Sequence, residues 1–197
     1  MSRIIVSSNT SGTGTVTLQA PSINSDSTLI LPSGTGTLSS LTLGTQVATT
    51  SGTTVTVATN IPSTVRRVTV LLYGVSTNGT SPIIIQFGTG STPTYVTTGY
   101  TSSSDNYQTA AGPIAGSTIG FIIGSVTSAA AAWYVPYVFV NMGSNMWVGG
   151  FSGTERTVGL SLGGGAVTLS DPLTAIRLNT VSGTGVFDAG TVNILYE

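Results

Sequence analysis

Apolar side chains recur at every second position in short stretches of this chain, and this spacing is what most limits the folds open to it. The clearest such stretches are Val16, Leu18 and Ala20; Val55 and Val57; Val68, Val70 and Leu72; Ile119, Phe121 and Ile123; and Val158, Leu160 and Leu162. Successive side chains of a strand point to opposite faces, so each stretch predicts a strand with one apolar face. Clusters of Gly, Pro, Asn and Ser separate the stretches, and almost no segment has helical spacing. We therefore predict an all-β protein, built as a sandwich or barrel.

Two segments, residues 83–87 and 133–140, are apolar at nearly every position. This predicts strands covered on both faces, either as central strands or as subunit contacts. Pro136 lies in the second segment and has no N–H for a ladder, which predicts an edge strand or a bulge there. Asn78-Gly79 stands between two predicted strands, which predicts a hairpin turn.

A change in composition near residue 44 divides the chain, because all 7 Tyr, 5 Phe and 2 Trp residues follow it. We predict an extended β segment over residues 1–44 and a head domain over residues 45–197. The first segment has too few large apolar side chains to close a core alone. We therefore expect it to attach the chain to its own main domain, to other copies or to a partner. The attachment residues that we expect are Val16, Leu18, Leu29 and Leu31.

Charged residues make up only 6% of the chain, against about 25% in ordinary globular domains. The polar surface must then consist of hydroxyls, amides and backbone groups. Such a surface repels other copies weakly, so burial against neighbouring copies is expected, and we predict a homo-oligomer. The formal charge of −1 provides no basic surface for nucleic acid, so no nucleic-acid partner is expected.

Targeting features are also missing from the sequence. The first 20 residues have no apolar core of the kind a signal peptide needs, and no run approaches the roughly 20 apolar residues of a membrane helix. We expect synthesis in a host cytoplasm and no membrane insertion. Without Cys, stability must come from side-chain packing, ladder hydrogen bonds and oligomerisation.

The chain lacks most side chains that catalysis uses. It has no His, no Lys and no Cys, which excludes a Ser-His-Asp triad, a Ser-Lys dyad and a P-loop. Its six carboxylates have no ligand-like spacing, so we expect no metal and no cofactor. We predict that the chain is not an enzyme. One catalytic alternative is glycoside hydrolysis by two acids that meet in space, for which Asp105 and Glu155 are the residues to replace.

Four residues in a Thr/Ser/Gly-rich region form the candidate binding site: Tyr95, Tyr100, Asp105 and Tyr107. Exposed aromatic rings beside a carboxylate are a common way to hold a sugar, so this group is the candidate contact for a receptor or glycan. The alternative is that these tyrosines cover an edge of the core.

Other conspicuous residues are assigned structural roles. Arg66 and Arg67 enter a predicted strand, and we expect an ion pair there, with Glu155 or with a neighbouring subunit. Trp133 and Trp147 fall in apolar runs and are expected in the core or at an interface.

Two stretches resemble a family of tailed-bacteriophage virion proteins. Residues 174–197, TAIRLNTVSGTGVFDAGTVNILYE, resemble the C-terminal closure of a β-sandwich head in that family. Residues 65–88 are similar to the opening strands of the same domain. Residues 14–32, with the GTVTLQAP and TLILP motifs, resemble a repeated segment of phage fibre and related particle proteins. The middle, from about residue 95 to 147, departs from the family pattern.

The resemblance implies a jelly-roll-like antiparallel β-sandwich, commonly trimeric, with an N-terminal attachment segment on the exterior of a phage particle. Our first expectation is a short trimeric tail fibre that binds a host-surface glycan and contacts other virion proteins. A capsid decoration or cement protein is the alternative, and a polysaccharide-degrading spike is a third possibility. Copy number on the particle separates the first two.

Overall fold

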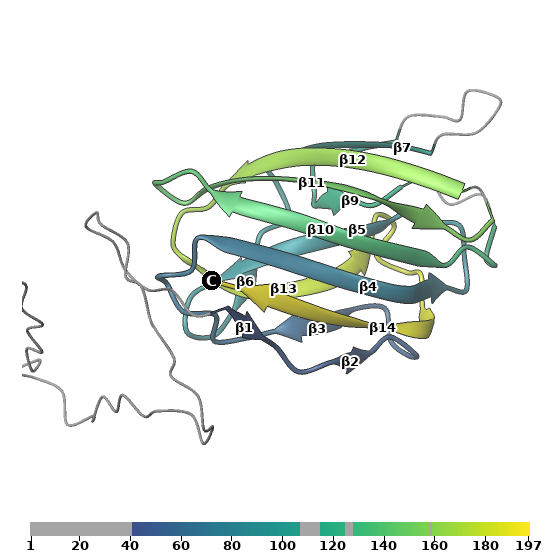
Figure 1. Cartoon of the computed structure of the whole chain (residues 1–197), viewed down its shortest axis with the longest axis horizontal. Helices are drawn as coiled ribbons and strands as arrows, with labels where there is room; N and C mark the ends of the chain where they lie inside the picture. Colours follow the sequence, from purple (N-terminus) through teal and green to yellow (C-terminus); the bar gives the residue numbers. More distant parts are fainter. Residues whose placement is uncertain (1–40, 107–114, 125–127, 158) are drawn as a thin grey trace, which may run out of the picture. The chain divides into compact units, whose positions relative to one another are not determined.

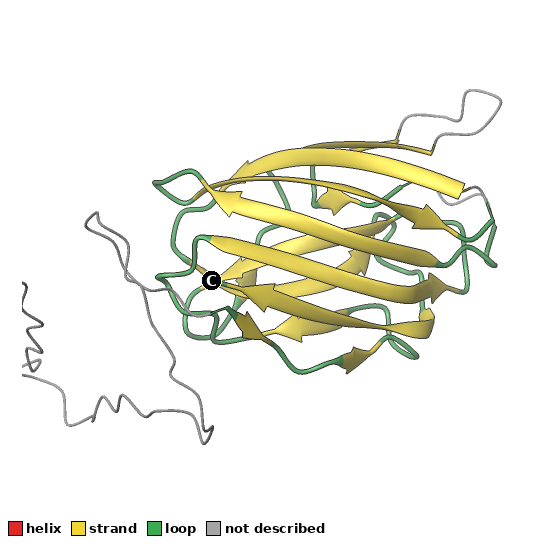
Figure 2. Ribbon diagram, in the orientation of Figure 1, coloured by secondary structure: helices red, strands yellow, loops and turns green. Residues whose placement is uncertain are grey.

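The computed structural model describes residues 41–106, 115–124, 128–157 and 159–197. The regular elements in these ranges are all strands, which form two antiparallel sheets packed as a sandwich (Figures 1 and 2). The predicted all-β antiparallel sandwich is confirmed. Within the same ranges, no helix is long and apolar enough to cross a membrane.

The larger sheet contains nine strands. In spatial order it runs β1 (Thr42–Leu43), β14 (Phe187–Tyr196), β4 (Arg67–Thr77), β10 (Trp133–Asn141), β11 (Met146–Glu155), β12 (Gly159–Thr168), β7 (Thr101–Asn106) and β8 (Ala115–Ser117). Strand β2 (Val47–Ala48) pairs with β14 beside β1. The edge next to β14 is thus made by two short strands that precede the rest of the sandwich in the chain.

The smaller sheet contains five strands. In spatial order it runs β3 (Val55–Ala58), β13 (Leu173–Thr180), β5 (Ile83–Thr89) and β6 (Thr94–Tyr95), and β9 (Phe121–Ile122) also pairs with β5. Along the described strands, the chain passes from one sheet to the other at β2–β3, β3–β4, β4–β5, β6–β7, β8–β9, β9–β10, β12–β13 and β13–β14. Neighbours in sequence therefore often lie in different layers.

Aromatic rings fill the space between the layers. The buried Phe121 ring lies 5.2 Å from Phe87 of the smaller sheet and 4.6 Å from Phe139 of the larger sheet, measured between ring centroids. Trp147 is also buried, and its ring centroid is 5.6 Å from that of Phe87. Trp133 is buried as well, so both tryptophans are core residues, one of the two roles expected of them.

Residues 55–57, 68–72 and 160–162 form strands with one apolar face, as predicted, but that face does not always point inward. The stretch at residues 16–20 lies outside the described residues. Residues 119–123 supply only β9, in which Phe121 and Ile122 are both buried, so the prediction of one apolar face is wrong there. On β4, Val68 and Val70 are buried, whereas on β12 Leu160 is 46% and Leu162 is 47% exposed. Ser161 and Gly163 take the inward positions of β12 instead. Nothing larger fits at Gly163, because a Cβ there would lie 2.7 Å from both the Phe151 ring and the Ser103 carbonyl oxygen. An apolar residue at every second position predicts which side chains share a face of the strand, but it does not predict whether that face packs against the core.

The two fully apolar segments have different environments. All residues of β5 are buried, so residues 83–87 are covered on both faces, as predicted. Strand β10 is a central strand, as predicted, because it lies between β4 and β11. It alternates between buried and exposed positions, so the chain itself covers only one of its faces. The predicted edge position of Pro136 is wrong, because the strand is central. In the ladder between β10 and β11, the paired residues go from Tyr134 directly to Tyr137, so the missing N–H of Pro136 lies where that ladder has a gap. The predicted bulge is present, but it lies at residues 133–134, in the pairing with β4.

The predicted hairpin at Asn78-Gly79 is wrong, because β4 and β5 belong to different sheets. The side chain of Asn78 instead accepts a hydrogen bond from the Val186 backbone N–H at 3.0 Å, across the sandwich end. A hairpin turn joins β10 and β11, where Ser144 and Asn145 have φ values of 50° and 58°. Positive φ at both central residues defines a type I′ turn, whose twist matches the right-handed twist of the two strands that it joins. Asn tolerates this conformation better than most residues.

The predicted attachment segment lies almost entirely outside the described residues, including Val16, Leu18, Leu29 and Leu31. At its end, Thr42 and Leu43 pair with Tyr196 and Leu195 of β14. These two residues therefore complete one edge of the larger sheet.

Candidate functional site

The four residues of the predicted binding group have different environments. Tyr100 is only 2% exposed, and its hydroxyl oxygen accepts a hydrogen bond from the Phe87 N–H at 2.9 Å. Burial raises the pKa of Tyr100 to about 12. Its ring is therefore part of the core rather than a surface available to a ligand. Tyr107 lies outside the described residues.

Tyr95 and Asp105 lie on different sheets. Tyr95 is half-buried on β6 of the smaller sheet, and the Arg177 guanidinium carbon stands 4.2 Å from its ring centroid. Asp105 is half-buried on β7 of the larger sheet, opposite Leu162, and its Oδ1 has no hydrogen-bond partner among the described residues. The structure thus does not bring Tyr95, Tyr100 and Asp105 together on one exposed surface.

Glu155, the other acid considered for hydrolysis, is buried at 1% exposure. Its Oε1 accepts hydrogen bonds from the N–H groups of Ala132 and Thr157 at 3.1 and 3.0 Å, and its Oε2 accepts one from the Thr157 hydroxyl at 2.7 Å. These bonds tie the start of β10 to the end of β11. The carboxylate is held by the protein itself and does not face a groove.

The remaining charged groups near the sheets also make internal contacts. The ion pair predicted for the Arg66-Arg67 pair is formed by Arg67, with Glu197 as its partner rather than Glu155, at 2.8 Å. The Asp188 carboxylate accepts a hydrogen bond from the Ser76 hydroxyl. Among the residues that the structure describes, no three His, Cys, Asp or Glu side chains come together to hold a metal ion.

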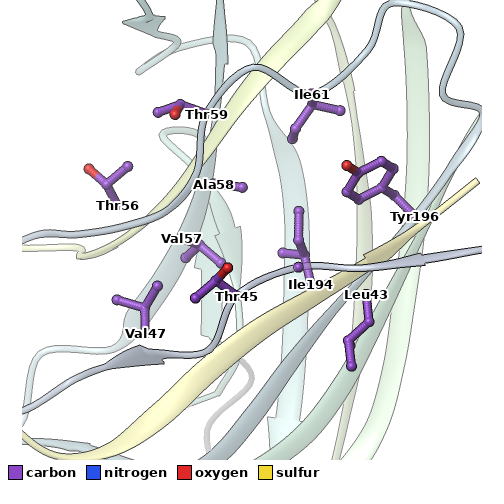
Figure 3. A pocket seen from close by; sticks show the side chains of 11 residues that line it. Leu43, Thr45, Val47, Thr56, Val57, Ala58, Thr59, Ile61, Ile194 and Tyr196 are labelled. Carbon is purple, nitrogen blue, oxygen red and sulfur yellow. The ribbon is translucent and has the colours of Figure 1, made fainter.

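A groove of about 480 Å³ opens along one side of the sandwich, between β1, β2 and β14 of the larger sheet and β3 of the smaller one (Figure 3). Val57, Ile61 and Ile194 contribute apolar surface, and Thr45 and Thr56 contribute hydroxyl groups. No Asp, Glu or Arg lines it. Such a groove can hold an uncharged group by shape and hydroxyl contacts, but it offers no group that would transfer a proton near neutral pH.

The outward surface of the larger sheet is the feature that sequence reasoning only partly anticipated. We call it the outer face and define it by the outward side chains of β4, β10, β11 and β12: Tyr73, Tyr134, Val138, Val140, Val148, Leu160 and Leu162, all of them exposed. Residues 133–140 were singled out as a central strand or subunit contact, but the contributions of β4, β11 and β12 were not. The apolar alternation of β12, read together with the run on β10, was the available clue.

No protein-family model and no curated protein matches the chain. Its groove, its outer face and its internally bonded carboxylates therefore have to be interpreted from their own chemistry.

Proposed function

We propose that the chain is a noncatalytic structural component of the exterior of a tailed-phage particle. In this proposal it forms a short trimeric fibre that displays the β-sandwich for binding to a host surface. Residues 174–197, which resemble the C-terminal closure of phage virion proteins, carry the proposal. They supply β13 and β14, and each of these is an internal strand of its sheet. The stretch with the resemblance is thus the stretch on which both layers depend.

The chemistry of the described surface supports a binding role without catalysis. The carboxylates of Glu155, Asp188 and Glu197 are engaged by protein donors, and the groove beside β3 is neutral. A neutral groove with threonine hydroxyls suits an uncharged sugar or an apolar group better than a charged ligand. A host-surface glycan is accordingly the ligand that we propose for the displayed head.

A capsid decoration protein is the second candidate, because a β-sandwich head with a neutral groove would equally suit a protein displayed on the capsid surface. A polysaccharide-degrading spike is disfavoured by the burial of Glu155, since a carboxylate at 1% exposure cannot reach a polymer. If hydrolysis nevertheless occurred, purified protein would release reducing ends from capsule, and replacing Asp105 would abolish that release.

Cryo-electron microscopy of particles of the encoding phage tests the proposal. We expect trimers in a few to tens of copies at the tail. Hundreds of copies on the capsid would favour the decoration protein instead. Particles that lack the chain altogether would contradict both candidates.

A further inference from the structure

We propose that the outer face of the larger sheet is the surface on which a second copy of this chain docks. The inference rests on the assembled state in the proposed function and names the surface that forms it. It does not depend on where the assembly sits on a particle.

The apolar residues of the outer face gather in two groups. In the first, Val140 lies opposite Val148, which lies opposite Ala166, and Tyr134 lies opposite Tyr73. In the second, Leu160 and Leu162 follow each other on β12, opposite the uncharged side chains of Thr154 and Ser152 on β11. Side chains directly opposite each other on one face of a sheet are in contact range. Within each group the apolar side chains are therefore close together, and the two groups are joined by neutral residues.

Strand β12 gives the strongest indication that this face is covered. Its two leucines point outward while Ser161, which is fully buried, and Gly163 point into the sandwich. The Ser161 hydroxyl has an internal acceptor, the Asp105 carbonyl oxygen at 3.1 Å. The inward positions are thus satisfied without large side chains, and both leucines remain about half exposed on the outer face. Their burial against another surface would recover the apolar contribution that this chain leaves in water.

The outer face is of the size that often marks a functional surface. Its four strands, β4, β10, β11 and β12, are neighbours in the sheet. With about 4.8 Å between strands and about 3.4 Å per residue, the seven residues from Tyr134 to Val140 give a projected area of about 450 Å², within the roughly 300–600 Å² of the largest apolar patch on a typical monomer. The flanking strands β14 and β7 continue this side of the sheet and can extend the contact toward the roughly 800 Å² that each partner contributes to a stable interface.

The lack of charged side chains in the centre of the outer face favours a second copy as the partner. Among the described residues, the charged groups of this sheet's outward side lie at its border: Arg67, which is paired with Glu197, Asp188 on β14, Asp105 on β7, and Arg156 beyond the end of β11. A charged partner would bury ions without counter-ions on this surface, which is costly. A neutral partner surface is required, and the same face of another copy provides one.

Shape is also compatible with self-association. Tyr73, at 72% exposure, and Tyr134 form a ridge with ring centroids 5.3 Å apart. At the far end of the face, Met142, Met146 and Val148 line a hollow of about 310 Å³. Between them, Gly150 and Gly164 lie opposite each other and carry no side chain that would hold two sheets apart. The ridge of one copy can therefore enter the hollow of a neighbouring copy, a contact that a trimer can repeat around its axis.

The first test is the native mass of the full chain, measured by sedimentation velocity at several concentrations. We expect wild type at a multiple of the chain mass of 19.8 kDa. Val138→Lys puts an unpaired charge at the centre of the contact and should raise the dissociation constant about 100-fold or more. Val181→Lys is the matched control, because Val181 has the same 38% exposure as Val138 but lies in the β13–β14 connection. It should leave the mass unchanged, and circular dichroism should show β structure in both variants.

Disulfide trapping provides a second readout, since the chain has no Cys of its own. Tyr73→Cys and Val148→Cys are combined in one chain. The two positions lie two strands and about six residues apart, which is roughly 20 Å, so they cannot form a bond within one chain. We expect oxidised double variant to run as a linked dimer or larger species on a non-reducing gel, and each single variant to run mainly as the single chain.

The outcomes separate the two proposals. A wild type that stays monomeric at all concentrations would overturn both this inference and the trimeric fibre. An assembled wild type whose mass is unchanged by Val138→Lys, and whose cysteine pair does not link, would overturn only the inference. Monomers that bind phosphatidylcholine vesicles through this face would assign it to lipid and would also contradict the inference.

Discussion

Replacing Phe121 by alanine would remove one of the rings that join the two layers of the sandwich. This ring is fully buried and contacts Phe87 of the smaller sheet and Phe139 of the larger one, and its centroid also lies 5.1 Å from that of Tyr100. Truncating a buried Phe costs about 3 to 5 kcal/mol, because apolar burial is lost and a cavity remains. Each lost ring pair adds about 0.5 to 1.5 kcal/mol. We therefore expect a loss near the top of that range, about 5 kcal/mol.

Urea unfolding of the full chain at one fixed concentration measures this loss, with the fluorescence of the buried Trp133 and Trp147 as the signal. With an m-value of about 2 kcal/mol/M, the midpoint should fall by about 2.5 M. Phe121→Leu keeps most of the volume and should cost about 1.5 kcal/mol. Leu41→Ala, at a side chain with 56% exposure, should cost less than about 0.5 kcal/mol. A Phe121→Ala protein within 1 kcal/mol of wild type, by that estimate of cavity cost, would refute the view that the ring cluster couples the sheets.

Three further predictions concern single groups, each checked by urea unfolding. Because burial raises the pKa of Tyr100 from 10.0 to about 12, the folded state keeps a proton that the unfolded state loses. Tyr100 should therefore contribute a fall in stability of about 2 kcal/mol between pH 10 and pH 12. Burial also raises the pKa of Tyr137, which adds to the decline, so Tyr100→Phe should remove only the Tyr100 share. Glu155→Ala leaves the N–H groups of Ala132 and Thr157 without their acceptor and should cost about 2 to 4 kcal/mol, whereas Glu155→Gln, which keeps one oxygen, should cost roughly half as much. Gly190→Ala should lower the free energy of unfolding by more than about 3 kcal/mol, because φ is 91° there and the new Cβ would lie 2.4 Å from the Gly74 carbonyl. Gly99 has a similar φ of 79° but open space around it, so Gly99→Ala should lower the free energy of unfolding by only about 1 to 2 kcal/mol. Equal costs at the two glycines would contradict the close contact.

Much of the fold follows from local sequence patterns, but the assignment of strands to sheets does not. The alternation of Val68 and Val70 and that of Leu160 and Leu162 are indistinguishable as patterns, yet the first pair is buried and the second is exposed. The difference arises from what each strand faces, which depends on long-range pairing. Asn78-Gly79 has the composition of a hairpin turn, yet it connects strands of different sheets, so local turn chemistry did not determine the partner.

The candidate binding site was less predictable than the fold. Tyr100 lies in a region rich in Thr, Ser and Gly, which favoured an exposed loop, but its hydroxyl has a backbone partner in Phe87 that only the tertiary structure supplies. The outer face was predictable in part, since the apolar run of residues 133–140 indicated coverage on both sides. The structure covers only one side within the chain. An alternation pattern cannot tell coverage by the same chain from coverage by another.

The position of β13 and β14 affects how the protein can be made. Both are internal strands, and β14 holds the edge strands β1 and β2 in place, although β13 and β14 follow all the other described strands in the chain. Neither layer can close until residues 173–196 have left the ribosome, and the earlier strands must wait with unpaired edges. A product truncated before residue 173 would lack a central element of each layer at once. Translation that ends early should thus yield chains that cannot mature, which keeps incomplete molecules out of any assembly.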